Sequence, residues 1–203
     1  MSSKNIVTNR RQFERILQLI DTVYQSALDD GRWNSLASQI AETFGSTSTT
    51  FQMQRMGDSS QILSTTENVR ARINDYRAHY WQRDIWVERG VELIGMSRVG
   101  SSRNMVSDNE FQETEFYRDW CRHLDVFYVV GAVFPAGPGE LGVLGIHRPR
   151  SSGAYEERTS TLLGRSFMPT GMPRRCWPMV VSCANVMDDC SVPMSLKTPG
   201  FQS

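Results

Sequence analysis

Apolar residues in the first quarter of the chain recur at steps of three and four, the spacing of one face of an α-helix. One such run covers residues 11–29, and a second extends from Trp33 to Phe44, directly before Gly45. Glycine immediately after the last apolar position is typical of a helix C-cap. The pattern predicts two amphipathic helices that pack as a hairpin or cover a sheet, preceded by a flexible N-terminus over residues 1–10.

The apolar period shortens to two over residues 47–54, where threonine, phenylalanine and methionine alternate with serine, threonine and glutamine. This alternation predicts a half-buried strand. Residues 57–60 have a turn composition, so residues 61–65 can return as the second arm of a hairpin. Residues 126–134 and 141–147 form a second pair of strand-like runs around a loop rich in proline and glycine.

Helical spacing occupies most of the chain between and after these strand pairs. It covers residues 67–92, and a capping box of Ser107 and Glu110 opens a further helix that carries Phe111 and Trp120. Another helix begins after residue 152, while residues 95–106 predict a loop or short strand. The resulting order predicts an antiparallel sheet flanked by helices, an α/β (α+β) fold of the PAS- or GAF-like sandwich type.

The composition of the 203 residues is that of a globular protein, with 39% hydrophobic and 22% charged residues. The 22 basic and 22 acidic residues cancel, which argues against a nucleic-acid binder that works through overall charge. No apolar run approaches the roughly 18 residues that a membrane-spanning helix needs, and no secretory leader opens the chain. We therefore expect a cytoplasmic protein without a membrane partner.

Enzyme motifs, including phosphate-binding loops and nucleophile elbows, are missing from the sequence, so we expect no catalytic residues and no cofactor. His79, His123 and His147 are widely spaced, and surface or core positions are the simplest interpretation for them. Cys176 and Cys183, with a third cysteine at the same interval, lack the fourth ligand of a structural zinc site. We expect no metal.

Aromatic residues concentrate in two predicted helical segments, residues 76–86 and 111–120, that flank the sheet. Tyrosine and tryptophan combine an apolar body with one hydrogen-bonding group, so they commonly line small-molecule pockets. They also commonly fill protein cores. Spacing alone leaves both interpretations open.

Four segments, in this order, resemble the sensor domain of LuxR-type helix-turn-helix transcriptional regulators. They are Tyr80–Trp86 (YWQRDIW), Thr114–Trp120 (TEFYRDW), Gly142–Pro149 (GVLGIHRP) and Gly153–Glu157 (GAYEE). The resemblance covers roughly residues 10–165, so it implies a sensor and dimerisation domain over 11–165. It also implies a small organic ligand and either a homodimer or a heterodimer with an intact regulator.

The resemblance further implies a ligand contact at Asp84, since acyl-homoserine-lactone-binding members use an aspartate four residues after a tyrosine, as Tyr80 precedes Asp84 here. Those members also carry a tryptophan and a tyrosine where this chain has Ala71 and Asp75, and a proline where it has Ile85. These differences argue against that lactone as the ligand. The candidate ligand-binding residues are Tyr76, Tyr80, Asp84, Trp86, Phe116, Trp120 and Tyr128.

The resemblance ends near residue 165, and residues 166–203 form an irregular stretch rich in proline, methionine and cysteine. Prolines at positions 169, 173 and 178 are incompatible with a continuing helix, at about 3 kcal/mol each. Read one base earlier, from the last base of the Phe167 codon, both Met-Pro pairs become alanine codons and an amphipathic helix returns. We therefore expect a frameshift-derived tail without a helix-turn-helix, and a regulator that has lost direct DNA binding. The alternative is a standalone small-molecule-binding or protein-interaction module without a transcriptional role.

Overall fold

A computed structural model of the chain describes residues 3–26, 29, 32–55 and 58–167. The strands are β1 (Ser48–Arg55), β2 (Ser59–Thr65), β3 (Arg98–Ser101), β4 (Tyr128–Gly137) and β5 (Glu140–Arg148). The α-helices are α1 (Ser3–Ser26), α2 (Trp33–Phe44), α3 (Glu67–Arg70), α4 (Ile73–Ala78), α5 (Ile85–Arg89), α6 (Asp108–Glu113) and α7 (Glu157–Phe167). Shorter 3-10 or π-helical turns are η2 (Tyr80–Arg83), η3 (Gly90–Ile94), η4 (Ser102–Asn104), η5 (Phe116–Trp120), η6 (Cys121–Leu124) and η7 (Arg150–Ser152).

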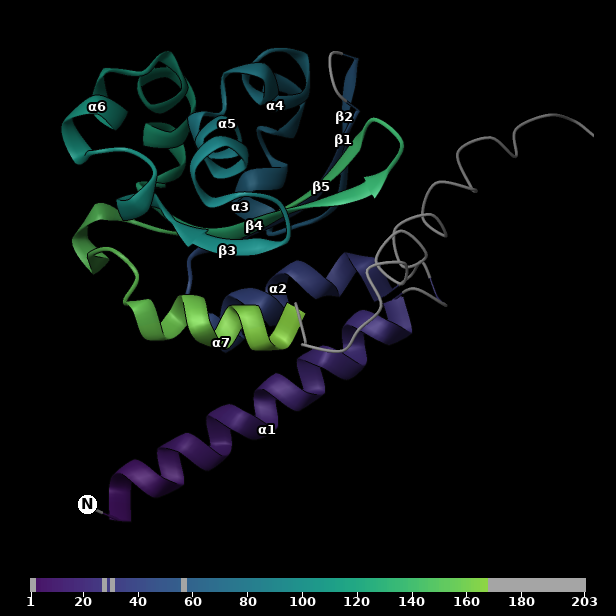
Figure 1. Ribbon diagram of the computed structural model, residues 1–203, viewed down its shortest axis with the longest axis vertical. Helices are drawn as coiled ribbons and strands as arrows, with labels where there is room; N and C mark the ends of the chain where they lie inside the picture. Colours follow the sequence, from purple (N-terminus) through teal and green to yellow (C-terminus); the bar gives the residue numbers. More distant parts are fainter. Residues whose placement is uncertain (1–2, 27–28, 30–31, 56–57, 168–203) are drawn as a thin grey trace, which may run out of the picture.

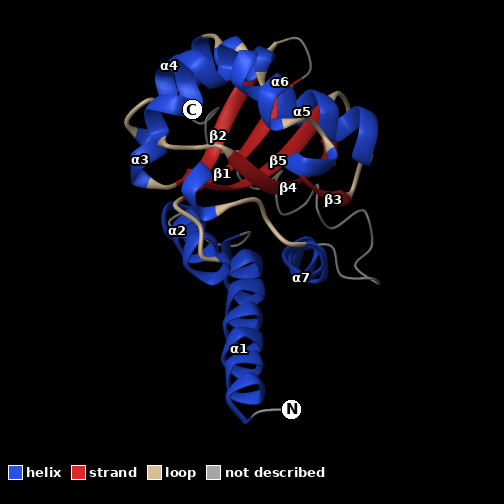
Figure 2. Cartoon of the chain, turned by 90° about the vertical axis from the view of Figure 1, so that its left-hand side faces the viewer, coloured by secondary structure: helices blue, strands red, loops and turns tan. Residues whose placement is uncertain are grey.

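The strands form one antiparallel sheet in the order β2-β1-β5-β4-β3. Helices α2 and α7 cover one face of this sheet, α1 packs against these two helices and extends away from the sheet, and the short helices from α3 to α6 cover the other face (Figures 1 and 2). Both strand pairs predicted from the sequence are hairpins, and the expected antiparallel sheet flanked by helices is confirmed. No helix in the described part of the chain is long and apolar enough to cross a membrane.

The larger core lies between the sheet and α1, α2 and α7. Phe51 of β1 stacks on Trp33 of α2 with ring centroids 5.2 Å apart, and lies 5.9 Å from the ring of Phe134 in β4. Leu36, Ile40, Leu144, Ile146 and Leu163 fill the space around these rings and are almost completely buried. Each such side chain contributes about 1.5–3 kcal/mol when removed from water, so this layer anchors the sheet.

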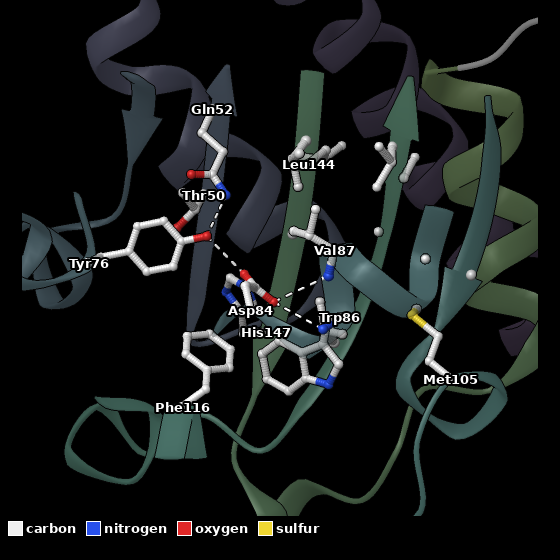
Figure 3. A pocket seen from close by; sticks show the side chains of 18 of the residues that line it. Thr50, Gln52, Tyr76, Asp84, Trp86, Val87, Met105, Phe116, Leu144 and His147 are labelled. Carbon is white, nitrogen blue, oxygen red and sulfur yellow. Dashed lines mark hydrogen bonds between the residues drawn. The ribbon is translucent and has the colours of Figure 1, made fainter. Parts of the chain in front are cut away.

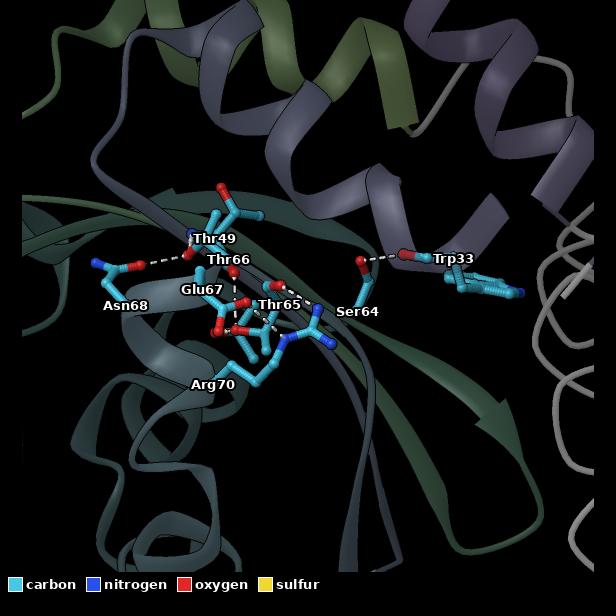
Figure 4. A network of polar contacts seen from close by, with 9 residues as sticks. Trp33, Thr49, Ser64, Thr65, Thr66, Glu67, Asn68 and Arg70 are labelled. Carbon is cyan, nitrogen blue, oxygen red and sulfur yellow. Dashed lines mark hydrogen bonds and ion pairs between the residues drawn. The ribbon is translucent and has the colours of Figure 1, made fainter. Parts of the chain in front are cut away.

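The edge strand β2 is fastened to α2 by a serine inserted into the first turn of that helix (Figure 4). The Ser64 hydroxyl donates to the carbonyl oxygen of Trp33 and accepts from the backbone N–H of Ala37, at 2.9 Å. These two groups are four residues apart, so the hydroxyl takes the place of one helical hydrogen bond. This contact fixes the edge of the sheet that carries residues of the site described below.

The burial of the sheet's other face shows that one prediction from the sequence was wrong. The alternation over residues 47–54 predicted a strand exposed on its polar side, but Thr50, Gln52 and Gln54 are buried as fully as Phe51 and Met53. Helices α3 to α6 cover these polar side chains. The strand is therefore buried on both faces, and one of those faces is polar.

Two of the predicted helices are also corrected. Residues 67–92 are not one helix, because the chain bends after Arg70 and again at Asp84, whose side chain caps a new helix. The Ser107 hydroxyl caps α6 as predicted, but that helix ends at Glu113, where Thr114 takes an extended conformation, and the π-helical η5 begins at Phe116. These breaks let short segments follow the curved sheet surface.

Helix α1 begins at Ser3, so most of the segment expected to be a flexible N-terminus is helical. Helix α7 begins at Glu157, close to the predicted start after residue 152. The expectations for the tail fall on residues 168–203, which lie outside the described residues.

Candidate functional site

A pocket lies between the sheet and the helices that cover its polar face, with a cavity of about 50 Å³ (Figure 3). This space has room for a few water-sized groups. Its apolar walls include Val69, Ile73, Trp86, Val87, Ile94, Met105, Phe116, Trp120, Val129, Val133, Val143 and Leu144. Its polar groups come from Thr50, Gln52, Tyr76, Asp84, Arg98 and His147.

The floor of the pocket is a row of glycines on neighbouring strands. Gly100 of β3 pairs with Gly131 of β4, and Gly131 pairs with Gly145 of β5. Gly145 in turn pairs with Thr50 of β1, and all four residues line the cavity. Because these glycines have no side chains, the sheet surface is lower here than in the rows beside it on the same face, which carry Val129, Val133 and Val143. Sequence reasoning missed this row, since only strand register brings its members together.

Aromatic rings from three separate segments form the wall opposite the floor. Trp86 of α5 meets Phe116 of η5 edge to face, with ring centroids 5.6 Å apart. Phe116 stacks on Trp120 at 5.5 Å, and Tyr76 of α4 lies 5.0 Å from the ring of Trp120. These rings are both core residues and pocket residues, so the two interpretations left open by their spacing hold together.

Asp84 places a carboxylate at the polar end of the pocket. Its Oδ1 accepts from the backbone N–H groups of Trp86 (3.1 Å) and Val87 (3.3 Å), which caps α5. Its Oδ2 accepts from the hydroxyl of Tyr76 at 2.8 Å. Burial raises the pKa of Asp84 to about 6, although these three hydrogen bonds favour the charged form.

His147 lines the same cavity from β5, its ring stacked on Trp86 at 5.9 Å. Its Nδ1 lies 3.2 Å from the hydroxyl of Ser48. Burial lowers the pKa of His147 to about 4, so the ring is neutral at physiological pH. Sequence reasoning did not include His147 in the site, although His147 lies in the segment GVLGIHRP that carries part of the family resemblance.

Five of the seven predicted ligand-binding residues meet in this pocket, namely Tyr76, Asp84, Trp86, Phe116 and Trp120. The structure does not bring the other two there. Tyr80 packs its ring against His79 at the start of η2. Tyr128 donates to Asp108 at 2.7 Å, and its ring contacts Phe127. The sequence cannot show this difference, because all seven residues are aromatic or acidic and only the packing of the chain decides which of them face the cavity.

The three positions at which the chain departs from the lactone-binding pattern, Ala71, Asp75 and Ile85, are not among the residues that line the pocket. Ala71 and Asp75 are exposed, and Asp75 pairs with Arg72 at 3.3 Å. Tyr76, the residue after Asp75, takes up the contact with Asp84 instead. The polar end of the pocket is therefore built from a different tyrosine from the one in the lactone-binding pattern.

The groups that line the pocket are suited to holding a small molecule. The thiol of Cys121 is buried and burial raises its pKa well above the usual value, which disfavours the reactive thiolate. Within residues 3–26, 29, 32–55 and 58–167, no three His, Cys, Asp or Glu side chains are grouped to hold a metal ion. Apolar walls with a few fixed polar groups are typical of small-molecule sites.

No family model matches the sequence, and no curated protein matches it either. The fold, however, is shared with solved structures. The ligand-binding domain of VqsR from Pseudomonas aeruginosa aligns with a TM-score of 0.56 at 15% identity, over 83% of this chain and 93% of that one. The N-acylhomoserine lactone-dependent LuxR-family transcription factor CepR2 from Burkholderia cenocepacia aligns at 0.53 and 14% identity, over 82% and 99%.

A GAF domain of a phosphoenolpyruvate-protein phosphotransferase from Coxiella burnetii also aligns, with a TM-score of 0.52 at 11% identity, over 85% of this chain and 93% of that one. The chain thus has the fold common to LuxR-family ligand-binding domains and GAF domains. The GAF-like sandwich expected from the order of helices and strands is confirmed.

Proposed function

We propose that this chain is the ligand-sensing domain of a LuxR-type transcriptional regulator and binds a small organic molecule in the pocket between the sheet and α3 to η5. The observation that carries the proposal is the pocket itself, with its glycine floor, aromatic wall and single carboxylate. The shared fold and the four family-like segments support it.

The ligand that suits this pocket has an apolar body and a hydrogen-bond donor. The apolar part would lie on the glycine floor against Trp86 and Phe116. The donor would face Asp84, whose Oδ2 accepts one hydrogen bond from Tyr76 and has a second lone pair. His147, neutral at physiological pH, adds one further polar group.

We further propose that the chain acts in the cytoplasm without binding DNA directly, as a homodimer or as a heterodimer with an intact regulator. The proline spacing after residue 166 supports the lack of a helix-turn-helix within residues 166–203, and the family resemblance supports dimerisation. A heterodimer would block its partner, since a dimeric operator site needs two DNA-reading halves.

Thermal unfolding in the presence of fractionated metabolite extracts tests the sensor proposal. A ligand at a hundred times its Kd stabilises by about 2.7 kcal/mol, which corresponds to roughly 5–10 °C in Tm for a domain of this size. We expect at least one fraction to produce such a rise. If none does across extracts of several growth conditions, the sensor proposal is wrong.

A matched pair of glycine variants tests whether the ligand that raises Tm binds in the pocket. A Cβ at Gly145 would lie 2.7 Å from Nε2 of His147 and would force the ring to shift, so Gly145→Ala should lose most of the ligand-induced rise in Tm. A Cβ at Gly164 in α7 meets no atom closer than 3.7 Å, so Gly164→Ala should keep the rise. Equal rises in both variants would place the ligand elsewhere.

A gel-shift experiment with the purified chain tests the DNA-binding part of the proposal. We expect no specific retardation of operator fragments at moderate salt, where nonspecific phosphate contacts are weakened. Retention of an intact LuxR-type regulator by the tagged chain would support the heterodimer. Specific retardation by the chain alone would contradict the loss of DNA binding, and a ligand-induced rise in Tm without any regulator partner would favour the standalone module.

A further inference from the structure

A continuous chain of hydrogen bonds connects the edge strand of the sheet with the carboxylate in the pocket. The Ser60 hydroxyl of β2 donates to Oε1 of Gln52 in β1 at 2.9 Å. Nε2 of Gln52 donates to the Tyr76 hydroxyl at 2.8 Å, and that hydroxyl donates to Asp84 at 2.8 Å. Figure 3 shows the last two of these bonds. We refer to Ser60, Gln52, Tyr76 and Asp84 as the relay.

The direction of the relay follows from its last member. Asp84 accepts two backbone N–H groups as the cap of α5, and an ionised carboxylate can only accept. The Tyr76 hydroxyl must therefore donate its single proton to Asp84. It can then only accept from its other neighbour, so the Gln52 amide group presents its NH₂ to Tyr76 and its oxygen to Ser60. Each residue fixes the orientation of the next.

Because the relay residues are buried, breaking one of their hydrogen bonds would cost free energy. Ser60, Gln52 and Tyr76 are 4%, 3% and 3% exposed, so water cannot replace a lost partner. Gln54 provides the contrast, because it lies two residues along the same face of β1, is equally buried, and its Nε2 has no hydrogen-bond partner in the described part of the chain. Of these two buried glutamines of β1, Gln52 is therefore the one that is hydrogen-bonded to a pocket residue.

We propose that Gln52 and Ser60 are positioning residues that hold the Tyr76 hydroxyl toward Asp84 and so keep Asp84 an acceptor for a donor group of the ligand. The part that concerns the ligand rests on the proposed function. The orientation of Tyr76 does not, since it is a property of the protein alone. Neither Gln52 nor Ser60 is marked by the family-like segments.

The test is the pKa of the Asp84 carboxyl, measured by carbon-13 NMR titration of the full chain without added ligand. Gln52→Glu is isosteric but has no N–H, so its carboxylate would accept from Tyr76 and compete with Asp84 for the phenol proton. We expect the pKa of Asp84 to rise by about 1 unit or more, from the lost hydrogen bond and the added like charge. The Tyr76 phenol and the Cys121 thiol near Asp84 have pKa values raised well above their usual range and stay neutral. His147, which lines the same cavity, has its pKa lowered to about 4 and stays neutral while Asp84 titrates near 6.

Gln54→Glu is the matched control, since it adds the same charge on the same buried strand face, outside the relay. It should change the pKa of Asp84 by less than half as much as Gln52→Glu. Ser60→Ala, which frees the Gln52 amide to turn, should raise the pKa in the same direction by a smaller amount and provides the test if Gln52→Glu does not fold. An unchanged pKa in the folded relay variants, or equal shifts in both glutamate variants, would overturn the proposal.

The outcome is independent of the ligand experiments above. A protein that shows the pKa shifts but no ligand-induced rise in Tm would keep the relay and lose the sensor proposal. A protein that binds a ligand with no pKa shifts would do the reverse.

Discussion

Replacing Asp84 with asparagine is expected to stabilise the protein at pH 7.5, by about 2–3 kcal/mol, and to abolish ligand binding. The pKa of Asp84 is about 6 in the folded protein and about 3.9 in an unfolded chain, and each unit corresponds to 1.36 kcal/mol. A raised carboxyl pKa means that the folded state favours the protonated form. The stability it contributes is therefore present below about pH 4 and is lost as the pH rises through about 6. Asparagine carries no charge and can still accept the N–H groups at the start of α5.

Urea unfolding of both proteins between pH 4 and pH 8 measures this effect. The stability difference should be largest above pH 6 and should approach zero near pH 4. His147 acts in the opposite direction, because its pKa is lowered to about 4 and its contribution is lost as the pH falls from about 6.5 toward 4. The unmodified protein should therefore have a flatter pH profile than Asp84→Asn, whose stability should fall in acid.

Asp119→Asn, at an exposed position of η5, is the control and should change stability by less than about 0.5 kcal/mol. If Asp84→Asn is less stable than the unmodified protein at every pH, the carboxylate stabilises the fold and no ligand is needed to explain its presence. If it is more stable, the protein retains a partly buried carboxylate at a cost in stability, as functional sites commonly do.

Replacing Gly131 with alanine is expected to destabilise the protein by about 3 kcal/mol or more. A Cβ at this position would lie 2.1 Å from the carbonyl oxygen of Leu144, on the adjacent strand β5. This oxygen belongs to the backbone of the paired strands at the centre of the sheet and cannot turn away as a side chain can. Relief would require β4 and β5 to separate, which would disrupt the pocket floor and the core on the opposite face.

Urea unfolding compares this variant with Gly164→Ala. Gly164 lies within α7, where alanine is the better helix former and no atom is close to the added Cβ, so that variant should gain about 0.5–1 kcal/mol. A Gly131→Ala protein within about 1 kcal/mol of the unmodified chain would show that the strands can shift to admit a side chain. In that case close packing of the strand backbones would not explain why glycine occupies position 131.

The candidate site was predictable where its residues occur in helical segments with a strong aromatic signal. Tyr76, Trp86, Phe116 and Trp120 were identified in this way, and Asp84 by its place in a family-like segment. Gln52 and His147 were not, because polar residues that alternate along a strand have the pattern of a solvated face. Only the helices packed over that face make them part of a pocket.

The sequence by itself determined the local elements. Spacing of three and four set α1 and α2, alternation set the first hairpin, and two strand-like runs around a proline- and glycine-rich loop set the second. The Ser107 cap set the start of α6. Each of these signals depends on residues within a few positions of one another. Tertiary structure alone decided the pocket. Thr50, Gly100, Gly131 and Gly145 are far apart in the chain and become neighbours only through the register of four strands. That register is a long-range packing outcome, and a cavity is defined by the side chains that surround it rather than by any single segment.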